Sequence, residues 1–66
     1  MSVNERISEL VALYRTFSFD EIEMLALAAD ADYRNAPANE KADAYADMMA
    51  IKAVSDELHL TGTIAA

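Results

Sequence analysis

The stretch YRNAPANEKADAY, from Tyr33 to Tyr45, decides the architecture, because it sets a proline and two asparagines between two alanine-rich runs. A proline pushes the residue before it out of the α-helical region, so a helix entering this stretch should end near Asn35 or Ala36. Pro37 itself suits the first turn of a following helix, with Asn39 as a competing cap. The stretch therefore predicts two helices with a short connection, which we expect to pack as an antiparallel hairpin.

Local signals mark where the other helices begin and end. Ser2 with Glu5 and Ser18 with Glu21 fit the S-x-x-E capping box, in which a hydroxyl and a carboxylate bind unpaired backbone N–H groups. The only glycine, Gly62, is expected to close the last helix. Strand signals are absent, because β-branched residues are sparse and scattered. We expect one all-α domain, residues 1–66, with three helices over about 2–16, 18–35 and 37–60.

Length and composition limit how this domain can be stabilised. A chain of 66 residues buries only about 60% of the surface that its unfolded form exposes, so a solitary core is marginal. The chain has no cysteine, and its lone histidine, His59, cannot complete a zinc site. Regular helix packing and oligomerisation are the remaining ways to stabilise so small a domain, and we predict a homo-oligomer.

The charge balance narrows the class of partner. Twelve carboxylates against five lysines and arginines give a formal net charge of −7. This field repels nucleic-acid phosphates and attracts basic surfaces. Direct binding to nucleic acid is therefore disfavoured, and a protein partner with a basic or apolar surface is favoured. The alternative is that the charge only keeps an apolar-rich small protein in solution.

The start and the hydropathy of the chain bear on its location. Charged residues occur within the first ten positions, where a secretion signal would need an apolar core. No apolar run approaches the roughly 20 residues that span a bilayer. We expect no membrane association and a cytoplasmic protein of a bacterium or a phage-infected bacterium.

Helical periodicity separates the first predicted helix from the other two. The first has a single apolar face, whereas the second and third each have two. Because a three-helix monomer buries one stripe of each helix, the second stripes predict an interaction site. We expect self-association through Met24, Leu27, Ala28, Ala31, Met48, Ile51, Val54 and Leu58.

A second candidate site flanks the hairpin connection. Tyr33 with Arg34, and Lys41 with Tyr45, would meet at one end of an antiparallel hairpin. Two rings and two cations suit a small anion that carries a flat base. The alternative is local pairing of the cations with neighbouring aspartates and burial of the tyrosines in the hairpin.

Other polar residues give weaker indications. Glu40, Asp43 and Asp47 share one helical face, which suits either a cation or plain solvation. His59 lies near the predicted end of the last helix, where it suits a capping role better than that of a general base. With no nucleophile, base and carboxylate set identifiable, we predict no catalytic residue, no metal site, no cofactor and no enzymatic activity.

The segment PANEKADAYADM, Pro37 to Met48, resembles the helical hairpin of small bacteriophage proteins that sequester cyclic oligonucleotide messengers of bacterial immunity. In that family too, a proline precedes a Glu-Lys pair that opens an alanine-containing helix, as Pro37, Glu40, Lys41 and Ala44 do here. The resemblance implies a helical oligomer that binds nucleotides between subunits, with Lys41 as the position of interest. The first helix has no counterpart in it.

Two functions follow as expectations. The first is a non-enzymatic interaction protein that self-associates and binds or inhibits a partner protein, as regulators and the inhibitors of mobile elements do. The alternative is an oligomeric sponge for a small phosphate-containing ligand such as a cyclic nucleotide, of the phage counter-defence kind.

Overall fold

The computed structural model describes residues 2–65, with side chains up to residue 60, and this part of the chain is all-helical. Its elements are α1 (Val3–Tyr14), α2 (Phe19–Asn35), a short 3₁₀ helix η1 (Ala38–Glu40) and α3 (Lys41–Ala65). Within the described residues no strand is present. The prediction of an all-α chain with three α-helices is therefore confirmed.

Side-chain caps begin the first two helices. At the start of α2, the Glu21 backbone N–H donates to Ser18 Oγ over 3.2 Å, and the Ser18 N–H donates to Glu21 Oε1 over 3.3 Å. Both halves of the predicted capping box are therefore formed there. At the start of α1, Ser2 Oγ accepts the Glu5 N–H over 3.2 Å. Each hydroxyl satisfies a backbone donor that has no partner inside its helix.

The third helix begins later and ends later than predicted. Residues 38–40 form a 3₁₀ turn with no side-chain cap, in which the Glu40 N–H donates to the Pro37 carbonyl. Asn39 is therefore not a cap, because the tighter turn satisfies the backbone instead. The helix also continues past Gly62 to Ala65, so the predicted stop at Gly62 is wrong. A glycine inside a helix costs only about 1 kcal/mol, which does not force an end.

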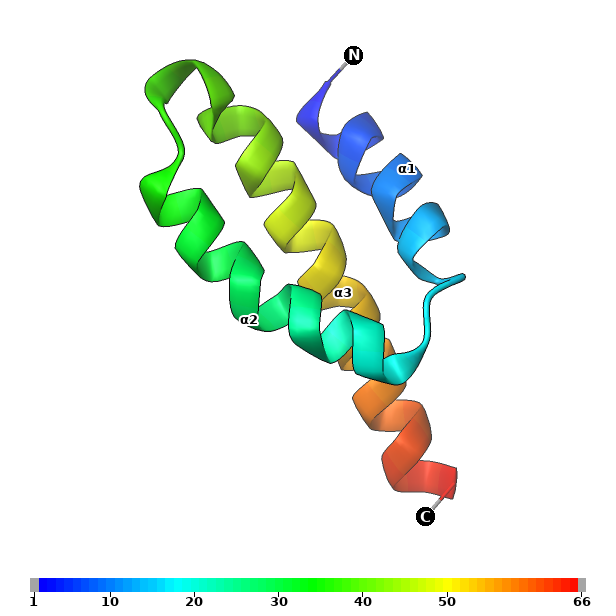
Figure 1. Ribbon diagram of the computed structural model, residues 1–66. Coiled ribbons are helices and arrows are strands. Elements are labelled where there is room, and N and C mark those ends of the chain that lie inside the picture. The colour runs from blue at the N-terminus through cyan, green and yellow to red at the C-terminus, as the bar shows by residue number, and fades with distance from the viewer. Residues whose placement is uncertain (1, 66) are drawn as a thin grey trace.

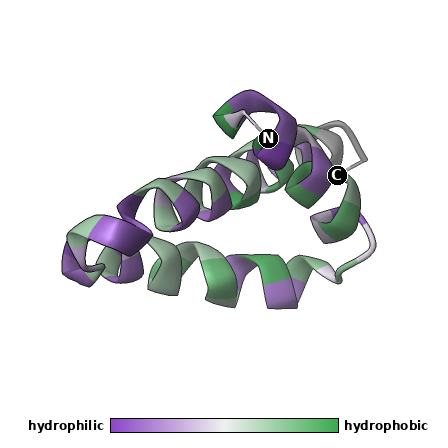
Figure 2. Ribbon diagram, turned by 90° about the horizontal axis from the view of Figure 1, so that it is seen from above, coloured by the Kyte–Doolittle hydropathy of each residue, from purple (hydrophilic) through white to green (hydrophobic). Residues whose placement is uncertain are grey.

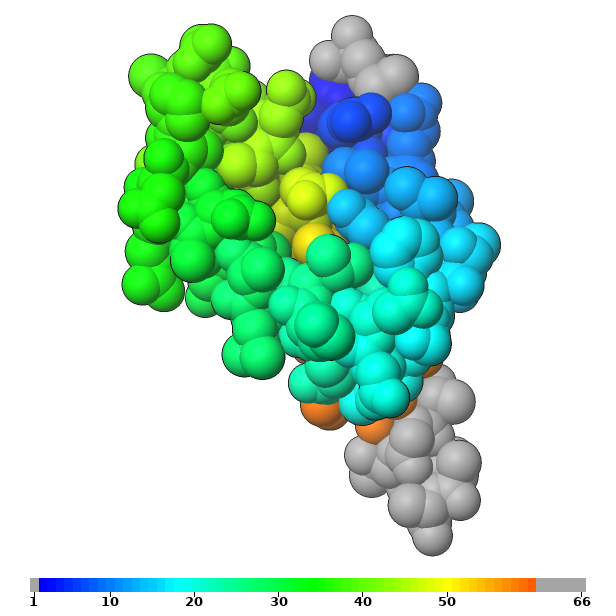
Figure 3. Space-filling view, viewed as in Figure 1, coloured from blue at the N-terminus to red at the C-terminus, as the bar shows by residue number. Residues whose placement is uncertain are grey.

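Helix α3 is the central element of the fold. It packs along both α1 and α2, which have no comparable contact with each other. The ribbon and the space-filling view both place α3 between the other two (Figure 1, Figure 3). The core is made of residues from all three helices: Leu10, Tyr14, Ile22, Ala29, Ala46, Ala50, Ile51 and Val54.

Three alanines belong to this core. Ala46 and Ala50 on α3 and Ala29 on α2 are all buried. Small side chains allow helix axes to come close together while the larger Ile22, Ile51 and Val54 fill the remaining space. The alanine-rich composition thus serves packing within the subunit.

Polar contacts also fasten α1 to α3. Arg15, just after α1, forms two hydrogen bonds with Glu57, at 2.6 Å and 3.1 Å. Both side chains are exposed, so the pair orients the end of α1 more than it stabilises the fold. None of the described helices is long and apolar enough to cross a membrane.

Candidate interaction surface on helix α2

One side of α2 is exposed along its whole length, and we call this side the α2 outer face. It lies opposite Ile22 and Ala29, which are buried against the core. Met24 is 72% exposed and Leu27 is 81% exposed. Green and purple stretches alternate along the ribbon, as expected for amphipathic helices (Figure 2). The residues of the α2 outer face are Asp20, Met24, Leu27, Ala28, Ala31 and Asn35.

A small apolar pocket adjoins the N-terminal half of this face. It is lined by Phe17, Glu21, Met24 and Leu25 and has a volume of about 220 Å³. Phe17 and Leu25 pack against the core, so the floor of the pocket is fixed while Met24 forms an exposed wall. This volume suits one apolar side chain.

Carboxylates border the α2 outer face on both sides. Helical geometry places Glu21 and Asp32 along one flank, and Glu23, Asp30 and Arg34 along the other. With Asp20 on the face itself, five carboxylates stand against one guanidinium. Arg34 Nη2 lies 3.6 Å from Asp30 Oδ2, so this cation is already paired. The border is therefore strongly acidic.

The α3 half of the predicted self-association surface lies inside the subunit. Ile51 and Val54 are each 1% exposed, and Met48 and Leu58 pack against the same core. Ile51 and Val54 are therefore not available to another copy of the chain, which corrects the prediction for these two residues, and Met48 and Leu58 are half-buried. The physical reason is that α3 has neighbours on two sides and buries a wide arc. Of the eight predicted residues, Met24, Leu27, Ala28 and Ala31 remain exposed.

Helix α3 has a second apolar stripe, and this stripe is the exposed one. Ala42, Tyr45, Met49 and Ala53 share that side and are all exposed. Sequence periodicity identified both stripes but could not tell which one would meet α1 and α2.

Three of the four predicted ligand-binding residues meet at the connection between α2 and α3. The Tyr33 and Tyr45 ring centroids are 5.8 Å apart, and Lys41 Nζ lies 5.0 Å from the centroid of Tyr33. Lys41 Nζ also donates to the Arg34 carbonyl over 3.3 Å, which caps the end of α2. The fourth residue, Arg34, extends instead to Asp30. Both cations are thus engaged by groups of the chain itself.

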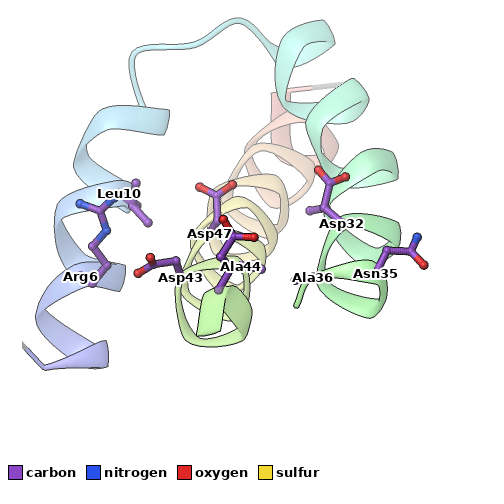
Figure 4. A pocket seen from close by; sticks show the side chains of 10 residues that line it. Arg6, Leu10, Asp32, Asn35, Ala36, Asp43, Ala44 and Asp47 are labelled. Atoms are coloured by element: carbon purple, nitrogen blue, oxygen red, sulfur yellow. The ribbon is translucent and has the colours of Figure 1, made fainter. Parts of the chain in front are cut away.

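The three carboxylates that the sequence places on one helical face, one in η1 and two in α3, line a larger pocket between the helices. Glu40, Asp43 and Asp47 share it with Asp32 of α2 and Arg6 of α1 (Figure 4), and its volume is about 550 Å³. We call it the carboxylate pocket. Its acidic lining disfavours phosphate and other anions.

One carboxylate of this pocket serves the fold. The Tyr14 hydroxyl donates a hydrogen bond to Asp47 Oδ1. Burial raises the pKa of Tyr14 to about 12, and the hydrogen bond and negative charge of Asp47 act in the same direction, against an opposing effect of Arg6. Asp47 therefore holds α1 against α3, a pairing between distant sequence positions that periodicity did not reveal.

His59 occupies a different place from the one predicted. Its Nε2 lies 2.6 Å from Glu23 Oε1, and its ring centroid lies 5.3 Å from that of Phe19. Since α3 continues to Ala65, His59 does not cap the last carbonyls. It ties the start of α2 to α3 instead.

The described residues contain no group of three or more His, Cys, Asp or Glu side chains arranged to hold a metal ion. Their ordered side chains form surfaces, one apolar with an acidic border and one carboxylate-lined. Such surfaces are suited to recognition of another molecule.

No protein-family model matches this sequence, and comparison with curated proteins and with solved structures likewise finds no match.

Proposed function

We propose that this chain is a non-enzymatic interaction protein that binds, and thereby regulates or inhibits, a partner protein through the α2 outer face. The observation that carries the proposal is the exposure of Met24 and Leu27 beside an apolar pocket. Contiguous exposed apolar side chains with a polar border are typical of protein contact sites.

Self-association is proposed only as the alternative use of the same face, with a second copy in place of a different partner protein. Burial of Ile51 and Val54 leaves α3 without the surface that the sequence assigned to it. We also propose that α2 and α3 form an antiparallel hairpin. The Tyr33–Tyr45 ring contact at one end and the Glu23–His59 contact toward the other support this arrangement.

Site-specific photo-crosslinking in cells tests the proposed function. A benzophenone amino acid at Leu27 should give a discrete adduct of higher mass, because this side chain points into solvent on the proposed contact face. The matched control is the same substitution at Leu13, which is 52% exposed on α1. Absence of an adduct at position 27, or equal adducts at both positions, would contradict the proposal. An adduct of twice the chain mass would identify a second copy.

A nucleotide sponge is the second candidate, favoured by the assembly of Tyr33, Lys41 and Tyr45. It would use the two rings for stacking and Lys41 for phosphate. It ranks second because Lys41 already binds the Arg34 carbonyl and the nearby pocket is acidic. Cyclic nucleotides should then raise the melting temperature, and Lys41→Glu should remove that rise. No rise across a panel of cyclic nucleotides would exclude it.

A further inference from the structure

We infer that the partner of the α2 outer face is a basic amphipathic helix, which places one apolar side chain in the pocket beside Met24 and its lysines or arginines against the flanking carboxylates. The inference rests on the proposed function and specifies its partner. Three features carry it: the length of the exposed face, the pocket at one end and the sign of the charge along both flanks.

The shape of the face favours a helix as occupant. Exposed side chains recur at positions 20, 24, 27, 28, 31 and 35, which is the repeat of one helical side. Its apolar members, Met24, Leu27, Ala28 and Ala31, form a narrow stripe of about two turns, with Asp20 and Asn35 beyond its two ends. A partner helix that repeats apolar residues at i, i+3, i+4 and i+7 matches such a stripe. The alanines at 28 and 31 allow its axis to approach closely.

The pocket supplies an anchor point. Its lining is mostly apolar, and Phe17 and Leu25 are held in place by contact with the core. A leucine- or phenylalanine-sized side chain would fill it and exclude water, as the central anchors of protein interfaces do. Glu21 stands at the rim, where it can meet a basic residue on the next turn of the partner.

The negative charge along the flanks of the α2 outer face determines the sign of the charge that a partner must carry. Five carboxylates and one paired guanidinium surround the stripe. Asp20 and Asp32 form no ion pair with any other described residue, so a partner's cations would meet Asp20 directly and Asp32 where the flank borders the carboxylate pocket. Complementary charge on both flanks speeds association and selects against acidic partners.

A second copy fits this face less well. A two-fold contact between two α2 outer faces would bring ten carboxylates together, since each face carries five. A contact with the exposed side of α3 would offer mainly Lys41 and Lys52, of which Lys41 already binds Arg34. Neither arrangement supplies enough positive charge to balance the carboxylates beside the α2 outer face.

Three labelled synthetic peptides of about 18 residues, close to the length of α2, test the inference by fluorescence anisotropy with the full chain. The first carries a leucine stripe with lysine and arginine flanks. The second has the same composition with the stripe scrambled, and the third keeps the stripe with glutamate flanks. We expect saturable binding of the first peptide alone, weakened by added salt.

Substitutions on the chain locate the binding site. Leu27→Glu should weaken binding of the basic striped peptide by at least about tenfold, because it places a charge in the centre of the stripe. The matched control, Leu13→Glu, should leave binding unchanged. Asp20→Asn combined with Asp32→Asn should weaken binding about fivefold and reduce its salt dependence. Circular dichroism checks that each variant keeps its helices.

Several results would overturn the inference. Equal binding of the scrambled peptide would show that net charge alone, without an apolar stripe, accounts for the affinity. Equal binding of the peptide with glutamate flanks would show that the partner need not be basic. An unchanged affinity of Leu27→Glu would move the site elsewhere. Sedimentation that shows a dimer of the chain alone, dissociated by Leu27→Glu, would make the second copy the occupant. If position 27 crosslinks to a cellular protein but no basic preference appears, the proposed function stands and this inference fails.

Discussion

The outer face of α2 and the buried arc of α3 look alike in sequence and meet opposite fates in the fold. Each has four apolar residues at helical spacing: Met24, Leu27, Ala28 and Ala31 on α2, and Met48, Ile51, Val54 and Leu58 on α3. Yet Leu27 is 81% exposed, whereas Ile51 is 1% exposed. The difference comes from position, because α3 lies between two helices and α2 has one neighbour.

The comparison shows that hydrophobic spacing identifies the faces of a helix but not their neighbours. A helix at the centre of a three-helix arrangement can bury an arc wide enough to hold residues that the sequence assigns to a separate surface. A peripheral helix has only one neighbour and buries a narrower arc, so its second apolar stripe remains exposed to water. Among the described side chains, large exposed apolar residues therefore remain on α2, as Met24 and Leu27, and on the far side of α3, as Tyr45 and Met49, besides Val3 and Leu13 of α1.

Truncation of one residue from each stripe should give the largest contrast. Ile51→Ala should lower the free energy of unfolding by about 2–5 kcal/mol, because it leaves a cavity among well-packed side chains. Leu27→Ala should change it by less than about 0.5 kcal/mol, as expected for an exposed position. Urea titration followed by circular dichroism measures both. Similar losses for the two variants would show that Leu27 is covered in solution.

Enlargement of one alanine from each stripe tests the same contrast in the opposite direction. Ala50→Leu should cost about 1–3 kcal/mol, because Ala50 is buried where α3 packs closely on its neighbours. Ala28→Leu should stay within about 0.5 kcal/mol, since its side chain faces solvent. Thermal unfolding of the two variants gives the comparison. A tolerated leucine at position 50 would contradict the close packing of α3.

The starts of the two helices also differ. Ser18→Ala should destabilise the protein by about 1 kcal/mol, because it removes the hydroxyl that caps α2. Asn39→Ala should have an effect below about 0.5 kcal/mol, since α3 follows a 3₁₀ turn without a side-chain cap. Chemical denaturation resolves the two. An equal loss of stability for Asn39→Ala would contradict this account, because it would show that the Asn39 side chain caps the start of α3.

An effect similar in size to that of Ser18→Ala is expected where α1 contacts the buried arc of α3. Tyr14→Phe should cost about 1 kcal/mol, through loss of the hydrogen bond to Asp47. The folded-state pKa of Tyr14 is raised from 10.0 to about 12, so its contribution is complete below pH 10 and is lost as the pH rises toward 12. Denaturation midpoints across this range measure the change. An identical alkaline loss in Tyr14→Phe would exclude Tyr14 as its source.

Sequence reasoning succeeded where the determinants were local. The Ser18–Glu21 capping box lies within one turn, and Pro37 acts on the residue beside it, so both could be read directly. It failed where determinants were distant. The Tyr14–Asp47 and Arg15–Glu57 pairs join the end of α1 to α3 over separations of 33 and 42 residues, and they hold α1 against α3.

The candidate site was predicted in part for the same reason. Met24 and Leu27 were identified because their stripe is separated from Ile22 and Ala29 by charged residues on both flanks. The pocket beside Met24 was not identified, because Phe17 belongs to the connection before α2 and its position depends on packing. The charged flanks could be predicted as well, because helical spacing alone places Glu23, Asp30 and Arg34 on one side and Glu21 and Asp32 on the other.

Hydroxyl-radical footprinting of the protein at micromolar concentration, with and without the basic striped peptide, tests the central contrast most directly. We expect fast labelling of Met24 and Leu27 and slow labelling of Ile51 and Val54 in the protein alone, with protection of Met24 and Leu27 when the peptide binds. Protection of Met24 and Leu27 in the protein alone, or labelling of Ile51 and Val54 at the rate of exposed residues, would contradict this account.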